Sequence, residues 1–272
     1  MASDKLTRKE IKNPDPFVRF TSALWAKIIE RQKAVGLGLI VAFAVFVVIA
    51  LAVRMTQSKA KEAGGALAAA LDLAHRPVDG SLEALQEDPT AKKFKSYKEK
   101  NEALASALDV VRNNHPGTEA GRTATLFWGD AEFQLGKLDE AGKAYDQYLA
   151  EARPGDPLRM MALEGLGYVH EAKKDLPKAY EAFDKMTREA AGEPGKARAA
   201  YHMARILEAQ GKKQDAVAAF QKLKEEFKEA PAAREAEERL ALLAMQGVPI
   251  PEKPKPAPKT PEAMPKPGSE AK

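Results

Sequence analysis

Three stretches of this chain repeat one arrangement of small and aromatic residues, and this repeat restricts the fold more than any other feature. A small residue is followed twelve residues later by alanine, and four residues after that by an aromatic residue. The three sets are Gly129, Ala141 and Tyr145; Gly167, Ala179 and Phe183; and Ala204, Ala216 and Phe220. Paired small residues let the two helices of a hairpin approach closely, and the aromatic residue then fills the space between hairpins. We therefore expect three consecutive helical hairpins.

The residues between these positions supply turns for the expected helices. Gly136 and Gly211 fall at the turn within the first and third hairpins, where the second hairpin has Lys174 and Asp175. The repeat periods are 38 and 37 residues. A typical unit of this kind has about 34, and the extended exit at residues 153–157 accounts for the excess.

A weaker copy of the pattern precedes the three hairpins, and one more helix follows them. Leu104 and Leu108 stand in for the alanine and the aromatic residue, ahead of a turn at residues 115–117. Residues 76–100 do not fit the pattern, so the partner helix of this first repeat is displaced. We expect residues 231–245 to cap the array, because a repeat cannot bury both of its faces alone.

The combined pattern resembles the tetratricopeptide repeat, whose unit reads W-x2-L-G-x2-Y, then A-x3-F, then P. It predicts an all-α fold in which residues 54–246 form a tetratricopeptide-like α-solenoid. The alternative interpretation is an unrelated helical bundle with alanine-rich seams. Three units that share spacing, aromatic position and turn disfavour it.

Residues 34–53 read AVGLGLIVAFAVFVVIALAV, without a charged residue. A helix of this length spans about 30 Å, the thickness of a bilayer's hydrocarbon core. We therefore predict a single N-terminal transmembrane helix. A cleaved signal peptide is the alternative, but the region before the run is too long and the run exceeds the usual length.

The charges around this segment predict its orientation. Lysine and arginine are more frequent before it than after it, and the side richer in them faces the cytosol. We expect residues 1–33 to be a cytosolic basic tail. The net charge of +4 is modest, and a basic tail beside a membrane helix indicates topology rather than nucleic-acid binding.

The segment before the anchor has a helical pattern of its own. Asp15 is placed to cap a helix that begins at Pro16. Its apolar stripe consists of Phe17, Phe20, Leu24 and Ile28, with Trp25 and Ile29 beside it. This stripe predicts either an interfacial helix on membrane lipid or a docking face for another protein.

Inside the anchor, Ala34, Gly38 and Ala42 form a stripe of small residues. Such a stripe allows another membrane helix to approach closely, although small residues are also common in membrane helices.

No residue pattern points to catalysis. The chain has no cysteine, and its four histidines lack the paired spacing that a metal site needs. Phosphate-binding loops and nucleophile motifs are also missing. We therefore expect no enzyme activity, no cofactor and no metal.

Residues 247–272 are rich in proline and lysine. They have almost nothing to bury, and their composition predicts a disordered tail.

The order of these parts resembles a family of bacterial inner-membrane proteins, the ancillary subunit of the SecYEG translocon. That resemblance implies a single-pass protein with a cytosolic N-terminus and a periplasmic repeat domain. The implied function is a scaffold that links emerging chains to folding factors. The implied partners are translocon subunits, periplasmic chaperones or substrate chains. An alternative is an envelope assembly or division adaptor whose basic tail contacts the cell wall or its machinery.

Tetratricopeptide domains in general bind partners on the concave face formed by the first helix of each hairpin. The resemblance therefore implies nine contact positions: Leu126, Asp130, Phe133, Glu164, Tyr168, Glu171, Tyr201, Arg205 and Glu208. A lysine and asparagine clamp for chaperone C-termini would need basic and amide residues where Leu126 and Asp130 stand. The clamp is missing, which disfavours a cytosolic co-chaperone.

Overall fold

The computed structural model describes residues 16–82 and 92–251 and divides the chain into two units, residues 1–65 and 66–272. The predicted all-α fold is confirmed. Outside its helices, the described part of the chain has one isolated backbone bridge, between Val78 and Phe94. The proposed cap Asp15 and residues 252–272 of the predicted tail lie outside the described residues.

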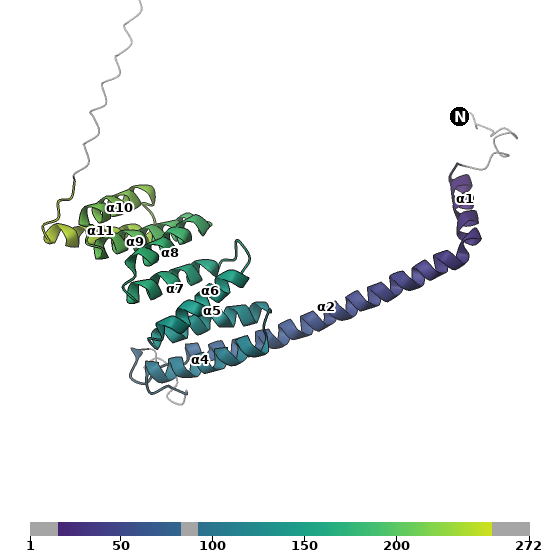
Figure 1. Ribbon diagram of the computed structural model, residues 1–272, viewed down its shortest axis with the longest axis horizontal. Helices are drawn as coiled ribbons and strands as arrows, with labels where there is room; N and C mark the ends of the chain where they lie inside the picture. The colour runs from purple at the N-terminus through teal and green to yellow at the C-terminus, as the bar shows by residue number, and fades with distance from the viewer. Residues whose placement is uncertain (1–15, 83–91, 252–272) are drawn as a thin grey trace, which may run out of the picture. The chain divides into compact units, whose positions relative to one another are not determined.

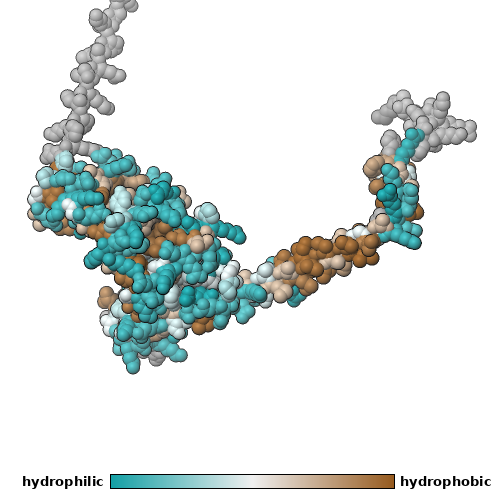
Figure 2. Space-filling model, viewed as in Figure 1, coloured by the Kyte–Doolittle hydropathy of each residue, from teal (hydrophilic) through white to brown (hydrophobic). Residues whose placement is uncertain are grey.

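The first unit contains α1 (Pro16–Glu30) and most of α2 (Gln32–His75). The helix α1 begins at the predicted proline, and most of the large side chains of its apolar stripe are exposed. The helix α2 includes the whole predicted anchor and continues to His75 without a break. Among the described helices, α2 alone is long and apolar enough to cross a membrane. Figure 2 shows apolar surface concentrated along it.

The second unit is a stack of antiparallel helical hairpins (Figure 1). The predicted hairpins are confirmed in order along the chain. Their helices are α5 (Glu119–Gln134) with α6 (Leu138–Glu151), α7 (Arg159–Ala172) with α8 (Leu176–Glu189), and α9 (Glu193–Ala209) with α10 (Lys213–Glu226). The first helices of successive hairpins also contact one another, α5 with α7 and α7 with α9.

The turns within the hairpins follow the sequence prediction. Gly136 and Gly211 both have a φ of 78°, in the left-handed region that glycine adopts without strain. Lys174 occupies the same place in the second hairpin, with a φ of 64°. A side chain at this φ costs conformational energy, so the second turn is the strained one of the three.

The small and aromatic residues of the repeat meet in the core of each hairpin. Ala141, Ala179 and Ala216 are fully buried. A Cβ atom added at Gly167 would lie 2.4 Å from the ring of Phe183, so the ring, not the alanine, supplies the nearest atoms. In the second hairpin the small residue therefore makes room for the aromatic ring of its own repeat, whereas a Cβ atom at Gly129 would meet both Ala144 (3.0 Å) and the ring of Tyr145 (3.1 Å).

The exit from the first hairpin is held by one arginine. Arg159, at the start of α7, donates hydrogen bonds to the carbonyl oxygens of Leu149 (2.8 Å) and Ala152 (3.1 Å) at the end of α6. It also forms an ion pair of 2.7 Å with Glu189 at the end of α8. These bonds satisfy carbonyl groups that a helix end otherwise leaves unpaired.

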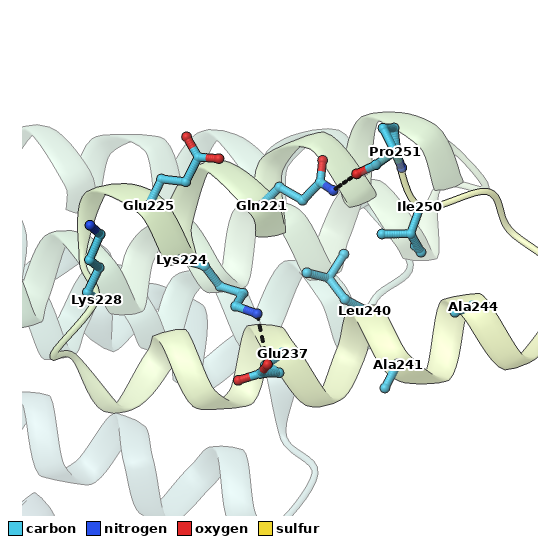
Figure 3. A pocket seen from close by; sticks show the side chains of 10 residues that line it. All are labelled: Gln221, Lys224, Glu225, Lys228, Glu237, Leu240, Ala241, Ala244, Ile250 and Pro251. Atoms are coloured by element: carbon cyan, nitrogen blue, oxygen red, sulfur yellow. Dashed lines mark hydrogen bonds and ion pairs between the residues drawn. The ribbon is translucent and has the colours of Figure 1, made fainter. Parts of the chain in front are cut away.

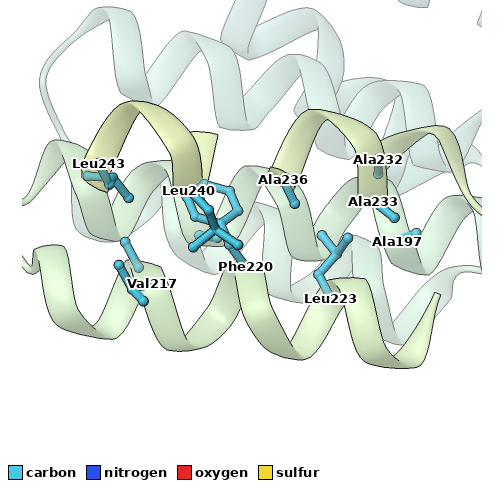
Figure 4. Close-up of a cluster of buried hydrophobic side chains, with 11 residues drawn as sticks. Ala197, Val217, Phe220, Leu223, Ala232, Ala233, Ala236, Leu240 and Leu243 are labelled. Carbon is cyan, nitrogen blue, oxygen red and sulfur yellow. The ribbon is translucent and has the colours of Figure 1, made fainter. Parts of the chain in front are cut away.

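The predicted C-terminal cap is α11, with bounds Pro231–Met245 that match the prediction. Figure 4 shows Leu240 of α11 beside Phe220 of α10 and Leu243 of α11 beside Val217 of α10, and all four side chains are buried in one cluster. The helix therefore covers the apolar surface that the third hairpin leaves open.

The displaced partner of the first repeat is the end of α2. The helix α4 (Tyr97–Asn114) contains the predicted Leu104 and Leu108, and it packs against α5. Leu108 belongs to a core cluster that includes four residues of α2: Ala66, Leu67, Ala70 and Leu71. The end of α2, which lies in the second unit, thus completes this repeat.

Candidate functional site

The nine predicted contact positions lie on α5, α7 and α9, the first helices of the three hairpins. We call the surface that these helices form the inner-helix face. Leu126 is fully buried in the cluster that contains Tyr145 and Tyr148, so it is a core residue and is not available to a partner. The other eight positions are partly exposed.

Aromatic rings run across the inner-helix face. The ring of Phe133 on α5 lies 6.4 Å from that of Tyr168 on α7, measured between centroids. Tyr168 also meets the ring of Phe183 edge-on at 5.8 Å, and Tyr201 lies 5.8 Å from Phe220. Because both tyrosines rest on buried phenylalanines, they stabilise the repeats as well as forming part of the surface.

Ion pairs join α7 to α9 and α9 to the cap helix α11. Both carboxylate oxygens of Glu171 of α7 accept hydrogen bonds from the guanidinium group of Arg205 of α9, and the bond to Oε2 is 2.8 Å long. Glu208 of α9 pairs with Arg239 of α11 at 2.7 Å. Glu171, Arg205 and Glu208 are therefore already paired within the chain, which leaves them less free to bind a partner.

Glu164 is the centre of a polar cluster between α7 and α9. Its Oε1 lies 2.9 Å from Nε2 of His202, and its other oxygen pairs with Arg198. Burial tends to raise the pKa of Glu164, but the hydrogen bond from His202 and the charge of Arg198 outweigh it, and the pKa is lowered. Burial and the nearby Glu164 raise the pKa of Tyr168 to about 12. Glu164 is thus held as a carboxylate at neutral pH.

Asp130 on α5 has a different environment. Its Oδ1 accepts a hydrogen bond of 2.7 Å from the hydroxyl of Tyr145. Burial raises the pKa of Asp130 to about 6, and repulsion from Glu164 adds to the rise, while the bond from Tyr145 opposes it. Asp130 is therefore a carboxylate that the fold holds at an energetic cost.

A groove of about 600 Å³ lies beside Asp130, between α5 and α7. It is lined by Asp130, Phe133, Gln134, Tyr145, Met161, Glu164, Gly165, Tyr168 and Arg198. Four of these are predicted contact positions, so the structure brings Asp130, Phe133, Glu164 and Tyr168 to one site. Its mixture of apolar, aromatic and charged groups is suited to recognising a polypeptide side chain.

A second groove, of about 800 Å³, lies at the other end of the repeats, between α10, α11 and residues 250–251 (Figure 3). An ion pair of 3.0 Å between Lys224 and Glu237 crosses it. The amide of Gln221 donates a hydrogen bond of 2.9 Å to the carbonyl oxygen of Pro251. The chain's own exit segment therefore lines this groove, and none of the predicted contact positions does.

The sequence prediction missed Met161, Arg198, His202 and Arg239. Arg198 and His202 link α7 to α9, and Arg239 links α9 to the cap helix α11. Glu164 and Arg198, like Glu171 and Arg205, are 34 residues apart, and complementary charges at that separation were the available signal. The described residues hold no group of three or more His, Cys, Asp or Glu side chains placed to bind a metal ion.

Comparison with protein families identifies the repeat. One model of the tetratricopeptide repeat matches residues 100–157 and 128–194, and a second matches residues 198–230. The chain is therefore a helical-repeat protein with the all-α fold of a solenoid. Its repeats are tetratricopeptide repeats, as the spacing of small and aromatic residues predicted.

Solved structures and curated proteins were also compared with the chain. Among solved structures, nearly identical TPR-like repeats from Podosopora anserina, in a protein assigned as a kinesin light chain, match with 17% identity and a TM-score of 0.47. The match covers 56% of this chain and 82% of the other, and a single-residue variant of that protein gives the same values. No curated protein matches the chain.

Proposed function

We propose that this protein is a membrane-anchored scaffold that binds other proteins on its inner-helix face. The observation that carries the proposal is the groove between α5 and α7, where Asp130, Phe133 and Tyr168 meet. Tetratricopeptide repeats typically act as non-catalytic interaction modules, and the groove offers a partner both apolar area and charge.

The proposed anchor is residues 34–53 within α2. Large apolar side chains such as Ile40 and Phe43 are about two-thirds exposed there, at 67% and 69%. Exposed apolar surface of this extent calls for lipid or another helix to cover it. In this proposal α1 lies on the cytosolic leaflet, and Ala34, Gly38 and Ala42 offer a contact for a second membrane helix.

We further propose where this scaffold works. Residues 1–33 are cytosolic and residues 54–246 are periplasmic, as the lysine and arginine bias suggests. The site of action is the Sec translocon of the inner membrane, where the repeats link emerging chains to folding factors. Support for this part comes from the order of tail, anchor and repeats in the sequence.

Site-specific photocrosslinking in intact membranes tests the binding face. A photoreactive amino acid is placed at Gln134, which is exposed and lines the groove, or at Lys143, which is exposed on α6 of the same hairpin and does not line it. We expect protein adducts from position 134 and few from position 143, with translocon subunits or periplasmic chaperones among them. Equal adducts from both positions would contradict the proposed binding face.

Reporter fusions test the orientation independently. A reporter that is active only outside the cytosol should work when fused at position 250 and fail at position 10. The reverse pattern would rule out both the periplasmic location and the translocon as the site of action.

A further inference from the structure

Two ion pairs between α7 and α9 share one offset, whereas the pair between Glu208 of α9 and Arg239 of α11 has an offset of 31 residues. Glu164 pairs with Arg198, and Glu171 with Arg205, each 34 residues further along the chain. The same offset from Asp130 leads to Glu164 itself. Between α5 and α7, this offset therefore pairs one carboxylate with another, where between α7 and α9 it pairs a carboxylate with an arginine.

Among the described residues, the carboxylates between α5 and α7 are not all paired with cations. Both oxygens of Glu164 already have partners, His202 on one and Arg198 on the other. Asp130 receives only the neutral hydroxyl of Tyr145 among its hydrogen bonds, and across residues 16–82 and 92–251 no ion pair joins it to a cation. Among the described residues, Asp130 is thus a carboxylate without an ion-pair partner, because Arg198, which lines the same groove, is paired with Glu164.

The surroundings of Asp130 favour a polypeptide over a free ion. Phe133, Met161 and Tyr168 line the same groove. The groove's volume of about 600 Å³ has room for more than one side chain. A cation alone would leave this apolar surface uncovered, whereas a protein segment can cover it and supply the charge.

We propose that the groove binds an extended segment of a partner protein through a lysine or arginine side chain. The cation pairs with Asp130, and a neighbouring apolar side chain of the segment packs against Phe133 and Met161. This inference rests on the proposed function, and it adds the chemistry of the partner: a segment that is basic and apolar rather than acidic.

Binding of this kind depends on pH in a defined direction. The groups that face Asp130 are Tyr145 from α6 and Glu164 from α7, with Arg198 of α9 in the same groove and His202 behind Glu164. Only ionised Asp130 attracts a cation, so bound cation lowers the pKa that burial has raised to about 6. The affinity of the groove for the cation is therefore highest when the pH is above about 6, and it falls as the pH drops below that value.

The test uses the full chain in nanodiscs of zwitterionic lipid. The probe is a fluorescent peptide of alternating leucine and lysine, and the matched peptide has glutamine in place of lysine. Binding is followed by anisotropy, with empty nanodiscs subtracted. We expect the lysine peptide to bind more tightly at pH 7.5. Asp130→Asn, which still accepts the bond from Tyr145, should weaken it about tenfold or more.

The control variant is Asp184→Asn. It removes the same charge from α8, outside the groove, and should leave the affinity unchanged. Lowering the pH to 5 should weaken binding to the parent and leave the weak binding to Asp130→Asn almost unaltered.

The remaining outcomes separate this inference from the proposed function. Equal binding of both peptides, or normal binding by Asp130→Asn, overturns the cation site while crosslinking from position 134 still supports the scaffold. Binding that appears only after deletion of residues 252–272 identifies the lysine-rich tail as the occupant and overturns the assignment to a partner. No binding to either form of the chain also overturns it.

Discussion

The interface between α7 and α9 and the interface between α5 and α7 are built from the same repeat. These two steps of the inner-helix face differ in which side chains occupy the space between the helices. Between α7 and α9, Glu164 is paired with both His202 and Arg198, so we call this step closed, and the ring of Phe183 stacks on that of His202 at 4.7 Å. Between α5 and α7, one carboxylate faces another across an open groove. The repeat thus fixes helix spacing without fixing what occupies the space between the helices.

The difference shows how a repeat array separates stability from binding. The closed step pairs its charges within the chain and buries the ring of Phe183, as a core does, although Nδ1 of His202 is buried without a hydrogen-bond partner. In the open step, between α5 and α7, burial makes ionisation of Asp130 cost free energy. Such a cost is typical of a residue that serves to bind a ligand. The following variants test this contrast, from the largest expected effect to the smallest.

Replacing the aromatic residue of each step should have unequal effects. Phe183→Ala should lower the free energy of unfolding by about 3 to 5 kcal/mol, because it empties a fully buried ring position. Phe133→Ala should cost about 1 kcal/mol, because that ring is only partly buried. Chemical denaturation of the full chain in detergent, followed by circular dichroism, measures both. Equal losses would mean that the open step is packed as tightly as the closed one.

The two glycines of the repeat offer a second test. Gly167→Ala should cost about 1 to 3 kcal/mol, because the new Cβ would lie 2.4 Å from the buried ring of Phe183. At Gly129 the nearest atom is 3.0 Å away, and alanine gains about 1 kcal/mol in helix propensity, so the net change should be close to zero. Melting temperatures compare the pair. A larger drop in melting temperature for Gly129→Ala than for Gly167→Ala would contradict this prediction.

Removing the charge of Asp130 and removing that of Glu164 should change the free energy of unfolding in opposite directions. Asp130→Asn should stabilise the domain by about 1 to 2 kcal/mol at pH 7, because burial raises the pKa of Asp130 above its unfolded value and penalises the charged form. The gain should vanish as the pH falls through about 6 toward the unfolded pKa, since the parent then takes up the proton.

Glu164→Gln should destabilise at neutral pH, because the folded pKa of Glu164 is lowered. That loss should disappear as the pH falls through the folded pKa. Denaturation curves across this pH range check both variants. A stabilising Glu164→Gln would show that its ion pair and hydrogen bond contribute no net stability.

The smallest effect concerns the turns of the two hairpins. Lys174→Gly should stabilise by about 0.5 kcal/mol, because it relieves a left-handed lysine but adds freedom to the unfolded chain. Gly136→Lys, at the matching turn, should destabilise by about 1 kcal/mol for the same reason. Thermal denaturation of both variants provides the comparison. A destabilised Lys174→Gly would mean that the lysine side chain makes a contact worth more than the strain.

Local patterns in the sequence predicted the hairpins well. The spacing of Gly167, Ala179 and Phe183 is a property of one repeat, and the same interval recurs in its neighbours. The bounds of α11 were also predictable, because Pro231 suits a helix start and Gly247 a helix end.

Contacts between repeats were harder to predict. The repeat period is 37 or 38 residues, yet side chains such as Glu171 and Arg205 meet at a separation of 34. Neighbouring first helices are therefore offset by about one turn, and nothing in a single repeat specifies that offset. The role of α2 in the first repeat was missed because Ala66, Leu67, Ala70 and Leu71 carry no repeat motif, although their spacing fits one helix face.

The arginine at the exit of the first hairpin has a consequence for cooperativity. In a linear array each repeat touches only its neighbours, so unfolding of one is transmitted to the next through their shared contacts. Arg159 binds the end of α6 and the end of α8 at once. The α5–α6 and α7–α8 hairpins are therefore expected to lose hydrogen-exchange protection together, as one folding unit, even though the surface between their first helices is open. A groove can form there without dividing the array.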